Sequence, residues 1–271
     1  MKKYPFSVLL LLPLVCLLAS FIPVAPPGTD PPATTLRSIK NESFKRGEVL
    51  CFRLHYGIID AGTAEVTVTD ENKLLNDRPT YHVVGIGKSR SAFDPFYKVR
   101  DRYESFIDEG SITPVVFIRR VNEGGYKINQ DQVYDHEKKK VMSNGKLFDI
   151  PEYTQDMISA FFYARTIDMS NVKAGDTFSL DSFIDNEIWP LKIRFICRET
   201  INTDVGKVRC LKFRPIVQRG RVFKKEEDLN VWISDDKNHI PVRAQADVLI
   251  GSVKMDLTSY ANLLNPLALV H

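Results

Sequence analysis

GKSRSAFDPFYKVRDRYESFID, residues 87 to 108, is the stretch of sequence that decides the fold. From Phe96 onward its side chains alternate as they do along a β-strand. One face carries Tyr97, Val99, Asp101, Tyr103 and Ser105, and the other carries Lys98, Arg100, Arg102 and Glu104. Neither face is purely apolar. The pattern indicates a strand that is solvated on one face or lines a polar site.

Strand patterns continue on both sides of this stretch. Before it, residues 47–57 and 63–70 alternate around a turn expected at 60–62, and a third strand runs up to Ser89. After it come strands at 114–122 and 126–135, and six more alternating segments follow between residues 176 and 260. About a dozen strands with short connections predict a mainly β protein, with a strongly curved antiparallel sheet or a half-open barrel.

One segment has the pattern of a helix. Residues 155–168, QDMISAFFYARTID, follow Thr154, which is a candidate N-cap. Apolar side chains recur at i, i+3, i+4 and i+7, at Met157, Ala160, Phe161 and Ala164. We expect this helix to pack on the sheet through that stripe.

The N-terminal residues have the pattern of an export signal. Residues 1–25 carry two lysines and then an apolar run, which is about long enough to remain as a membrane anchor if it is not cleaved. Cys16 lacks the small residue that lipoprotein processing needs just before it. Residues 26–42 form a Pro-rich tether, and residues 43–264 form a single β domain. We therefore expect an exported protein of the periplasm or cell envelope that touches membrane only through an uncleaved N-terminal segment.

The overall charge gives no case for nucleic acid as a partner. The chain has 37 Lys and Arg residues against 34 Asp and Glu residues, a net charge of +3, and two of the lysines lie in the leader. A protein that binds nucleic acid through bulk electrostatics needs a much larger or more clustered positive charge.

Three cysteines lie outside the leader: Cys51, Cys197 and Cys210. If residues 202–205 form a hairpin loop, Cys197 lies directly opposite Cys210, and the two could bond in an oxidising compartment. Directly opposed strand residues are usually slightly too far apart for a relaxed disulfide. Two buried free thiols are therefore the favoured interpretation, with the disulfide as the alternative.

No sequence motif of a known catalytic or metal centre is present, so we predict no catalytic residue, metal or cofactor. The five histidines are scattered, and none has metal-ligand spacing to a Cys or an acid. Asp101 and Glu104 would point to opposite faces of one strand and do not form a local acid–base pair.

Three arginines are candidates for binding an anion. Arg100 and Arg102 share a strand face, and Arg120 joins them if the next strand pairs alongside. Three guanidinium groups can hold a carboxylate or phosphate. The favoured alternative is a solvated face on which these arginines make salt bridges to Glu104 and its neighbours.

Four motifs in this order resemble the exported bacterial Domain of Unknown Function 3108 family: GEVLCFRLHYGIIDAGTAEVTV; KSRSAFDPFYKVRDRYESFID with Pro114 after it; DMISAFFYAR; and the pair VWISDD and HIPVRAQADVLIGSV. The resemblance covers residues 47–260. It implies an envelope protein with a strongly curved antiparallel sheet, loosely similar to periplasmic lipid and lipoprotein carriers that hold an acyl chain. The family has no established activity, so the likeness is one of fold.

These observations leave three hypotheses for function. The first is a non-catalytic module that binds a lipid-like or amphipathic anionic ligand, whose head group meets Arg100, Arg102 and Arg120. The second is an enzyme acting on an envelope polymer, with a polar constellation of Asp101, Tyr103, Glu123 and Tyr126. The third is an assembly or scaffold factor that binds a partner protein.

Overall fold

The computed structural model describes residues 36–216, 229–247 and 252–270, and these form fifteen strands and one short helix. The predicted leader at 1–25 and most of the predicted tether lie outside the described residues. The strands are β1 (Val49–Tyr56), β2 (Ile59–Val68), β3 (Lys73–Leu75), β4 (Arg78–Ser89), β5 (Arg100–Asp108), β6 (Pro114–Glu123), β7 (Tyr126–Asp135), β8 (Lys140–Ser143), β9 (Lys146–Asp149), β10 (Thr177–Ile184), β11 (Glu187–Thr203), β12 (Gly206–Pro215), β13 (Leu229–Ser234), β14 (Pro241–Asp247) and β15 (Ser252–Ala261); the helix is α2 (Ser159–Arg165).

All the strands belong to one antiparallel sheet, in the order β10-β11-β12-β13-β14-β15-β1-β2-β4-β5-β6-β7-β8-β9, with β3 paired to β4 alone. The predicted mainly β fold with a curved antiparallel sheet and one helix is confirmed. Within the described residues the end strands β9 and β10 do not pair with each other, so the sheet stays open.

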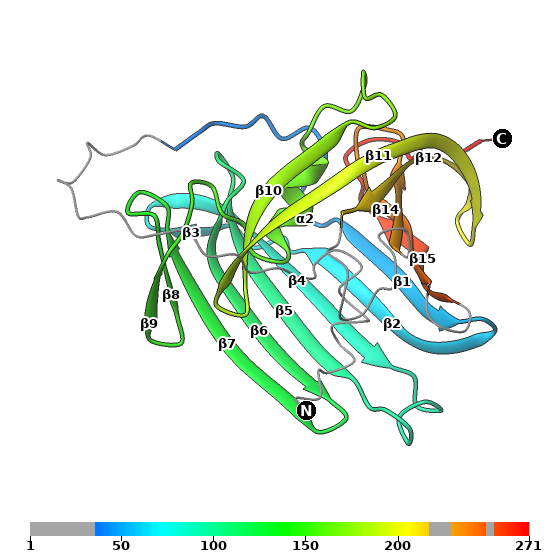
Figure 1. The fold of residues 1–271 in the computed structure, drawn as a ribbon, viewed down its shortest axis with the longest axis horizontal. Coiled ribbons are helices and arrows are strands. Elements are labelled where there is room, and N and C mark those ends of the chain that lie inside the picture. The colour runs from blue at the N-terminus through cyan, green and yellow to red at the C-terminus, as the bar shows by residue number, and fades with distance from the viewer. Residues whose placement is uncertain (1–35, 217–228, 248–251, 271) are drawn as a thin grey trace.

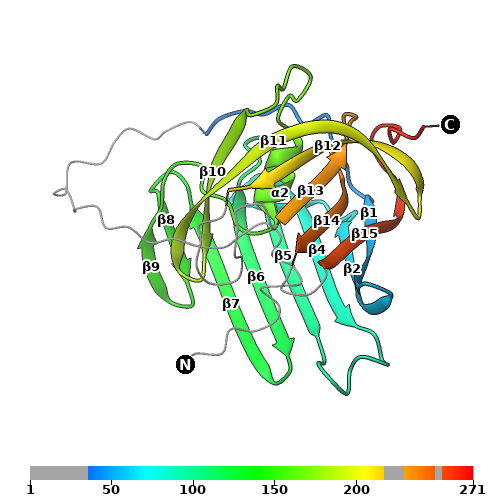
Figure 2. The ribbon, with the colours of Figure 1, turned by 45° about the vertical axis from the view of Figure 1, so that its right-hand side comes forward.

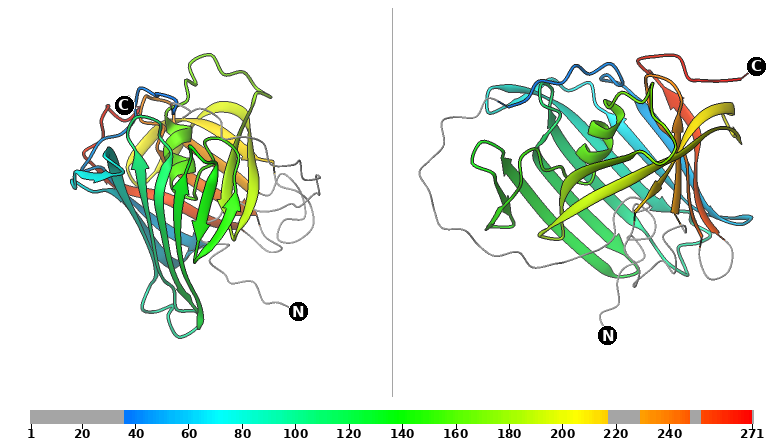
Figure 3. Two further views of the ribbon diagram at one scale, coloured as in Figure 1. Left: turned by 90° about the vertical axis from the view of Figure 1, so that its left-hand side faces the viewer. Right: turned by 45° about the horizontal axis from the view of Figure 1, so that its top comes forward.

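The sheet curves until one part of it arches over another. Strands β1, β2 and β4–β7 form a broad floor, and β10–β13 cross above it, with α2 between the two layers (Figures 1 and 2). Both views in Figure 3 show the helix inside this curve. Register shifts between Phe195 and Cys197 and between Trp232 and Ile233 are bulges, which bend strands.

The first hairpin turns at Gly57 and Ile58 rather than at the predicted 60–62. Gly57 supplies the positive φ of 56° that a two-residue turn needs, whereas Asp60 and Ala61 continue β2. Gly62 is required for another reason, because a Cβ there would lie 2.6 Å from the main-chain oxygen of Lys88. The shorter turn places two isoleucines, Ile58 and Ile59, at the tip of the hairpin.

The central stretch enters its strand later than predicted. β5 begins at Arg100, and residues before it turn back on themselves, with the main-chain oxygen of Phe93 accepting hydrogen bonds from the N–H groups of Phe96 and Tyr97. Beyond that point the predicted alternation holds. Asp101 and Tyr103 are buried.

The helix is half the length that the sequence predicts. The segment before it is held extended, because the Gln155 N–H donates to Asp181 and the Gln155 oxygen accepts from Phe183. Thr154 does not cap the helix; its hydroxyl donates to the main-chain oxygen of Pro151. The first turn is stabilised instead by Asp156. Its Oδ1 accepts hydrogen bonds from the N–H groups of Ile158 and Ser159, each at 2.7 Å.

The predicted register of the cysteine hairpin is wrong. The loop holds two residues, with Thr203 opposite Gly206, so the pairing shifts and Cys197 lies opposite Lys212. Cys210 faces Glu199, and all three cysteines of the described chain are free thiols. Both are free thiols, as the favoured interpretation has it, but only Cys210 is buried and Cys197 is half-buried; the possible disulfide between Cys197 and Cys210 is absent.

Both ends of the described chain pack on the sheet. The Ile39 N–H donates to the Gly110 oxygen at 2.7 Å, and the Arg37 guanidinium lies over the ring of Tyr163 at 4.3 Å. At the other end, Leu269 forms a β-bridge with Val208. None of the helices in the described residues is long and apolar enough to cross a membrane.

Candidate functional site

An apolar cavity of about 210 Å³ lies inside the curve of the sheet. Its floor comes from β1, β2, β4 and β5, through Phe52, Ala64, Val66, Gly85 and Tyr103. Its roof comes from the arching strands and the adjoining β14, through Phe178, Leu191, Ile193, Phe213, Val231 and Ala244. Alternation explains this lining, because the inward residues of these strands face the same space.

Most apolar side chains in and just before α2 line the cavity: Met157, Ile158, Phe161, Phe162 and Ala164. Phe162 is also fully buried and packs edge-on against Phe44, with ring centroids 4.8 Å apart. The predicted stripe is thus mainly a cavity wall, and Phe162 beside it also joins the helix to the core.

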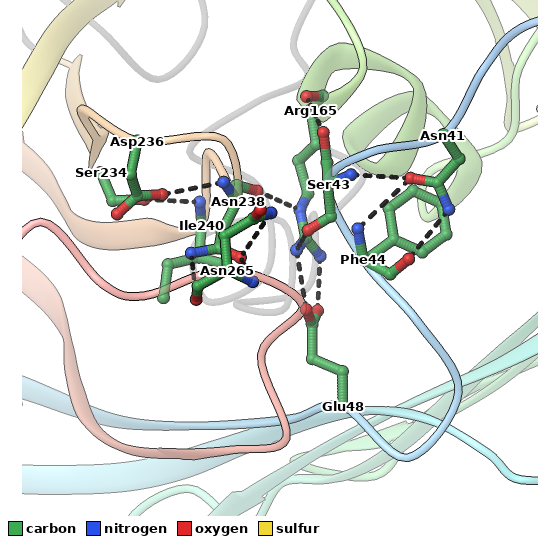
Figure 4. A network of polar contacts seen from close by, with 10 residues as sticks. All are labelled: Asn41, Ser43, Phe44, Glu48, Arg165, Ser234, Asp236, Asn238, Ile240 and Asn265. Carbon is green, nitrogen blue, oxygen red and sulfur yellow. Dashed lines mark hydrogen bonds and ion pairs between the residues drawn. The ribbon is translucent and has the colours of Figure 1, made fainter.

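Arg165, the last residue of α2, forms an ion pair with Glu48 beside the cavity (Figure 4). Its Nη1 and Nη2 donate to Glu48 Oε1 at 2.6 Å and Oε2 at 2.8 Å, and both side chains are 1% exposed. The remaining donors reach main-chain oxygens: Nε reaches Asn238 at 2.8 Å and Nη2 also reaches Ser43 at 2.9 Å. A buried charge is tolerated when it is paired and hydrogen-bonded in this way.

This ion pair joins segments that are far apart in the sequence. Asn238, in the loop between β13 and β14, donates from Nδ2 to the main-chain oxygen of Asn265 and accepts its N–H at 2.8 Å. The Ser43 hydroxyl donates to the main-chain oxygen of Arg165 at 2.8 Å, and His239 Nδ1 lies 2.8 Å from the same oxygen. The helix, the approach to β1, the β13–β14 loop and the C-terminal segment are therefore fixed to one another next to the cavity (Figure 4).

The three candidate arginines lie on the outer face of the sheet and do not line the cavity. Arg102 is directly opposite Arg120, as expected from strand pairing. Each arginine has an acidic partner: Arg100 pairs with Asp94 at 2.6 Å, Arg102 with Glu104 at 2.8 Å and Arg120 with Asp131 at 2.6 Å. This geometry matches the favoured alternative of a solvated face with salt bridges, because the β5 side chain that lines the cavity, Tyr103, lies on the opposite face of the strand.

Asp101, Tyr103 and Glu123 do come together, on the inner face, around Arg119. Arg119 lies opposite Tyr103 and donates to Asp185 at 2.6 Å. Burial raises the pKa of the Asp101 carboxyl, and bonding from Glu123 and the Asn122 N–H opposes that rise in part. Burial also holds the pKa of the Tyr103 phenol well above its usual range.

This cluster has little room for a substrate. Asp101 lines a cavity of about 20 Å³, which is space for roughly one water molecule. Asp101 and Glu123 are nine-tenths or more buried. Tyr126, the fourth candidate, lies directly opposite Glu123 in the pairing of β6 with β7 and is 44% exposed at the turn. The arrangement can hold a proton or a water molecule between carboxyls, but it offers no opening for a polymer.

A second buried acid supports the cavity wall. Asp156 lies just before α2, and its Oδ2 accepts the Ser105 hydroxyl at 2.6 Å. Burial raises the pKa of Asp156 to about 6, although hydrogen bonds from Ser105, Ser159 and Ile158 oppose the rise. In the described part of the chain, no three His, Cys, Asp or Glu side chains gather as metal ligands would.

A family profile described as "Protein of unknown function (DUF3108)" matches residues 51–258. The chain belongs to this family. The match spans the floor, the helix and the arching strands, so it includes both walls of the cavity. No curated protein matches this DUF3108 member by sequence.

One solved structure shares the fold. The β-barrel-like protein of domain of unknown function DUF1849 from Brucella abortus is 10% identical, with a TM-score of 0.52 over 84% of this chain and 99% of that chain. A candidate lipoprotein from Parabacteroides distasonis is 13% identical, with a TM-score of 0.35 over 83% of this chain and 100% of that chain. The first likeness shows the fold alone, and the second is too low to support an argument.

Sequence reasoning missed the Arg165–Glu48 pair and the roof of the cavity in this DUF3108 member. A signal for Arg165 was present, because it follows Phe161 by four residues and so places a charge beside the apolar stripe. Glu48 had no comparable signal, since it lies 117 residues away in the sequence.

Proposed function

We propose that this DUF3108 member is a non-catalytic binding protein that holds the apolar part of a lipid-like ligand. The observation that carries the proposal is the cavity of about 210 Å³, walled by apolar side chains from two layers of one curved sheet. Concave apolar sites of this kind are the common form of a small-molecule site.

The size and lining of the cavity define the ligand class. Pockets for drug-sized ligands are about 300–1,000 Å³, so this cavity suits a single acyl chain rather than a lipid with several. Arg165 borders it but is fully engaged by Glu48 and main-chain oxygens. The proposal therefore concerns an apolar chain, and a charged head group would lie outside the enclosed part.

The place of action that fits this proposal is the cell envelope. The export-signal pattern of residues 1–25 supports it. In an aqueous compartment outside the cytoplasm, a lipid chain needs an apolar enclosure to move away from a membrane.

An enzymatic role is less well supported by the same geometry. The inner-face acids Asp101 and Glu123 are enclosed, and the adjoining space is about 20 Å³. A polymer substrate needs an open groove along reactive groups, so the cavity remains the better candidate.

The experiment fills the cavity and measures the binding of a fluorescent fatty acid. Gly85 lies on the floor, and a Cβ there would make ordinary contacts of 3.9 Å with Ile158 and Tyr103, so Gly85→Leu adds a side chain to the cavity lining without a backbone clash. Thr67→Leu is the matched control, because Thr67 points to the outer face beside Glu65. We expect cis-parinaric acid to bind the wild type and the control alike, with affinity reduced at least about tenfold in Gly85→Leu.

Thermal melts confirm that the variants are folded. Equal affinity in Gly85→Leu and Thr67→Leu, or no binding by the wild type, would contradict the proposal. Mass spectrometry of the gently purified protein gives an independent readout, in which we expect a co-purifying lipid that Gly85→Leu loses.

A further inference from the structure

Three turns at one end of the floor are joined into a single edge, here called the hairpin edge (residues 57–61, 90–98 and 124–127). The Arg90 N–H donates to the Ala61 oxygen at 3.0 Å, and its guanidinium pairs with Asp60 at 3.4 Å. The Gly124 N–H donates to the Lys98 oxygen at 2.9 Å. The turns β1–β2, β4–β5 and β6–β7 all lie along the lower side of the floor in Figure 1.

The middle turn is held in place by a glycine. Gly124 has a φ of 52°, and a Cβ on it would lie 2.6 Å from the ring of Tyr97. The ring therefore packs directly on the turn between β6 and β7, and no larger residue fits there. The hairpin edge is a built surface rather than three independent loops.

Large apolar side chains project from this edge into solvent. Ile58 is completely exposed, Phe96 is 82% exposed and Ile59 is 54% exposed. Turn tips are usually occupied by Gly, Asn, Asp and Ser, which suit both the backbone and water. Exposed apolar groups gathered at one edge indicate a surface that contacts another apolar phase.

The same edge is basic. Together with the strand ends that flank its middle turn, residues 88–89 and 99–100, the hairpin edge carries five cations, at Lys88, Arg90, Lys98, Arg100 and Lys127, against the half-buried acids Asp60 and Asp94. The turns at the opposite end of the floor, 69–77, 109–113 and 136–139, carry five acidic and three basic side chains. The sheet floor therefore has a positive end with apolar tips and a negative end.

We propose that the hairpin edge docks on the surface of an anionic lipid bilayer. Isoleucine and phenylalanine side chains at narrow tips can enter the boundary between head groups and acyl chains, while the surrounding cations meet the anionic head groups. This contact would be separate from any contact made by the N-terminal segment. It does not depend on whether the cavity holds a ligand.

The test asks which end of the sheet floor touches the membrane in the full-length protein. Phe96→Trp places a tryptophan on the hairpin edge, and Leu74→Trp is the matched control at the opposite end, where Leu74 is 62% exposed. Vesicles of phosphatidylcholine and phosphatidylglycerol with brominated acyl chains quench tryptophans that reach the bilayer. We expect quenching at position 96 and little change at position 74, even if the leader also inserts.

Charge variants test the electrostatic part on the Phe96→Trp background. Reversing Lys88, Lys98 and Lys127 to Glu should raise the vesicle concentration needed for half-maximal quenching roughly 100-fold, since each cation contributes to attraction by the anionic surface. Reversing Lys73, Lys138 and Lys139 to Glu at the opposite end should not weaken quenching. Circular dichroism serves to check that both variants are folded.

The proposal is overturned by equal quenching at positions 74 and 96, by equal effects of the two charge triplets, or by equal quenching by vesicles of phosphatidylcholine alone. Absence of quenching at position 96 also overturns it, and that result would leave a protein partner as the occupant of the edge.

Discussion

The guanidinium of Arg165 binds both carboxylate oxygens of Glu48, and neither side chain is more than 1% exposed. This contact ties the end of α2 to the residue just before β1, across a cavity wall. Removing one partner leaves the other as an unpaired buried charge.

Glu48→Gln should therefore lower the free energy of unfolding by about 3–5 kcal/mol. The control is Arg102→Gln, which breaks an exposed pair with Glu104 and should cost less than about 1 kcal/mol. Urea denaturation of both variants measures the difference. Similar costs in the two variants would show that the Arg165 charge finds another partner.

The two adjacent phenylalanines of α2 should differ in their effect on stability. Phe162 is fully buried against Phe44, so Phe162→Ala should cost about 3–5 kcal/mol. Phe161 borders space that is already open, so Phe161→Ala should cost roughly half of that or less and should change fatty-acid binding instead. Urea denaturation and the fluorescence assay compare the two variants. A larger loss of stability in Phe161→Ala than in Phe162→Ala would show that the helix packs through Phe161 instead.

Asp156 should make the stability of the protein depend on pH. Its folded pKa of about 6 lies above its usual value of 3.8, so between these values the folded state binds more protons than the unfolded state. Ionisation of Asp156 therefore lowers the free energy of unfolding as pH rises from 4 to 6, by about 3 kcal/mol in total.

Asp156→Asn keeps an oxygen for the N–H groups of Ile158 and Ser159 but cannot ionise. We expect its stability relative to the wild type to improve by about 3 kcal/mol between pH 4 and pH 7. Urea denaturation at the two pH values measures this change. Asp168→Asn, at an exposed site, is the control. If the free energy of unfolding of Asp156→Asn differs from that of the wild type by the same amount at both pH values, Asp156 does not have the raised pKa.

Thiol reactivity tests the corrected hairpin register. Burial raises the pKa of the Cys210 thiol to about 12, so it should react with iodoacetamide far more slowly than the half-buried Cys197 and Cys51. Cys197→Ser should leave the melting temperature under oxidising conditions nearly unchanged. If Cys197 and Cys210 did form a disulfide, losing it would lower the free energy of unfolding by about 3 kcal/mol, as expected for so short a loop. A loss of stability of that size in Cys197→Ser would therefore show that the disulfide forms.

Local pattern predicted the class of the fold because strand alternation and turn chemistry depend on neighbouring residues. The faces of β5 follow from the spacing of Asp101 and Tyr103 against Arg100 and Arg102. The position of the first turn was predicted wrongly, since Gly57 and the Asp-Ala-Gly after it both resemble a turn, and only Gly57 has the required backbone conformation. The helix was overestimated because pairing of Gln155 with β10, a non-local contact, outweighed its local pattern.

The sequence by itself determined an antiparallel, mainly β chain with one amphipathic helix, because periodicity and turn residues act over a few positions. Only the tertiary structure decided which face of β5 turns inward, since both faces carry polar groups and alternation cannot rank them. It also decided that Arg165 meets Glu48 and that floor and roof enclose a cavity. Those features arise where segments distant in sequence pack together, and burial is a property of that packing rather than of any one segment.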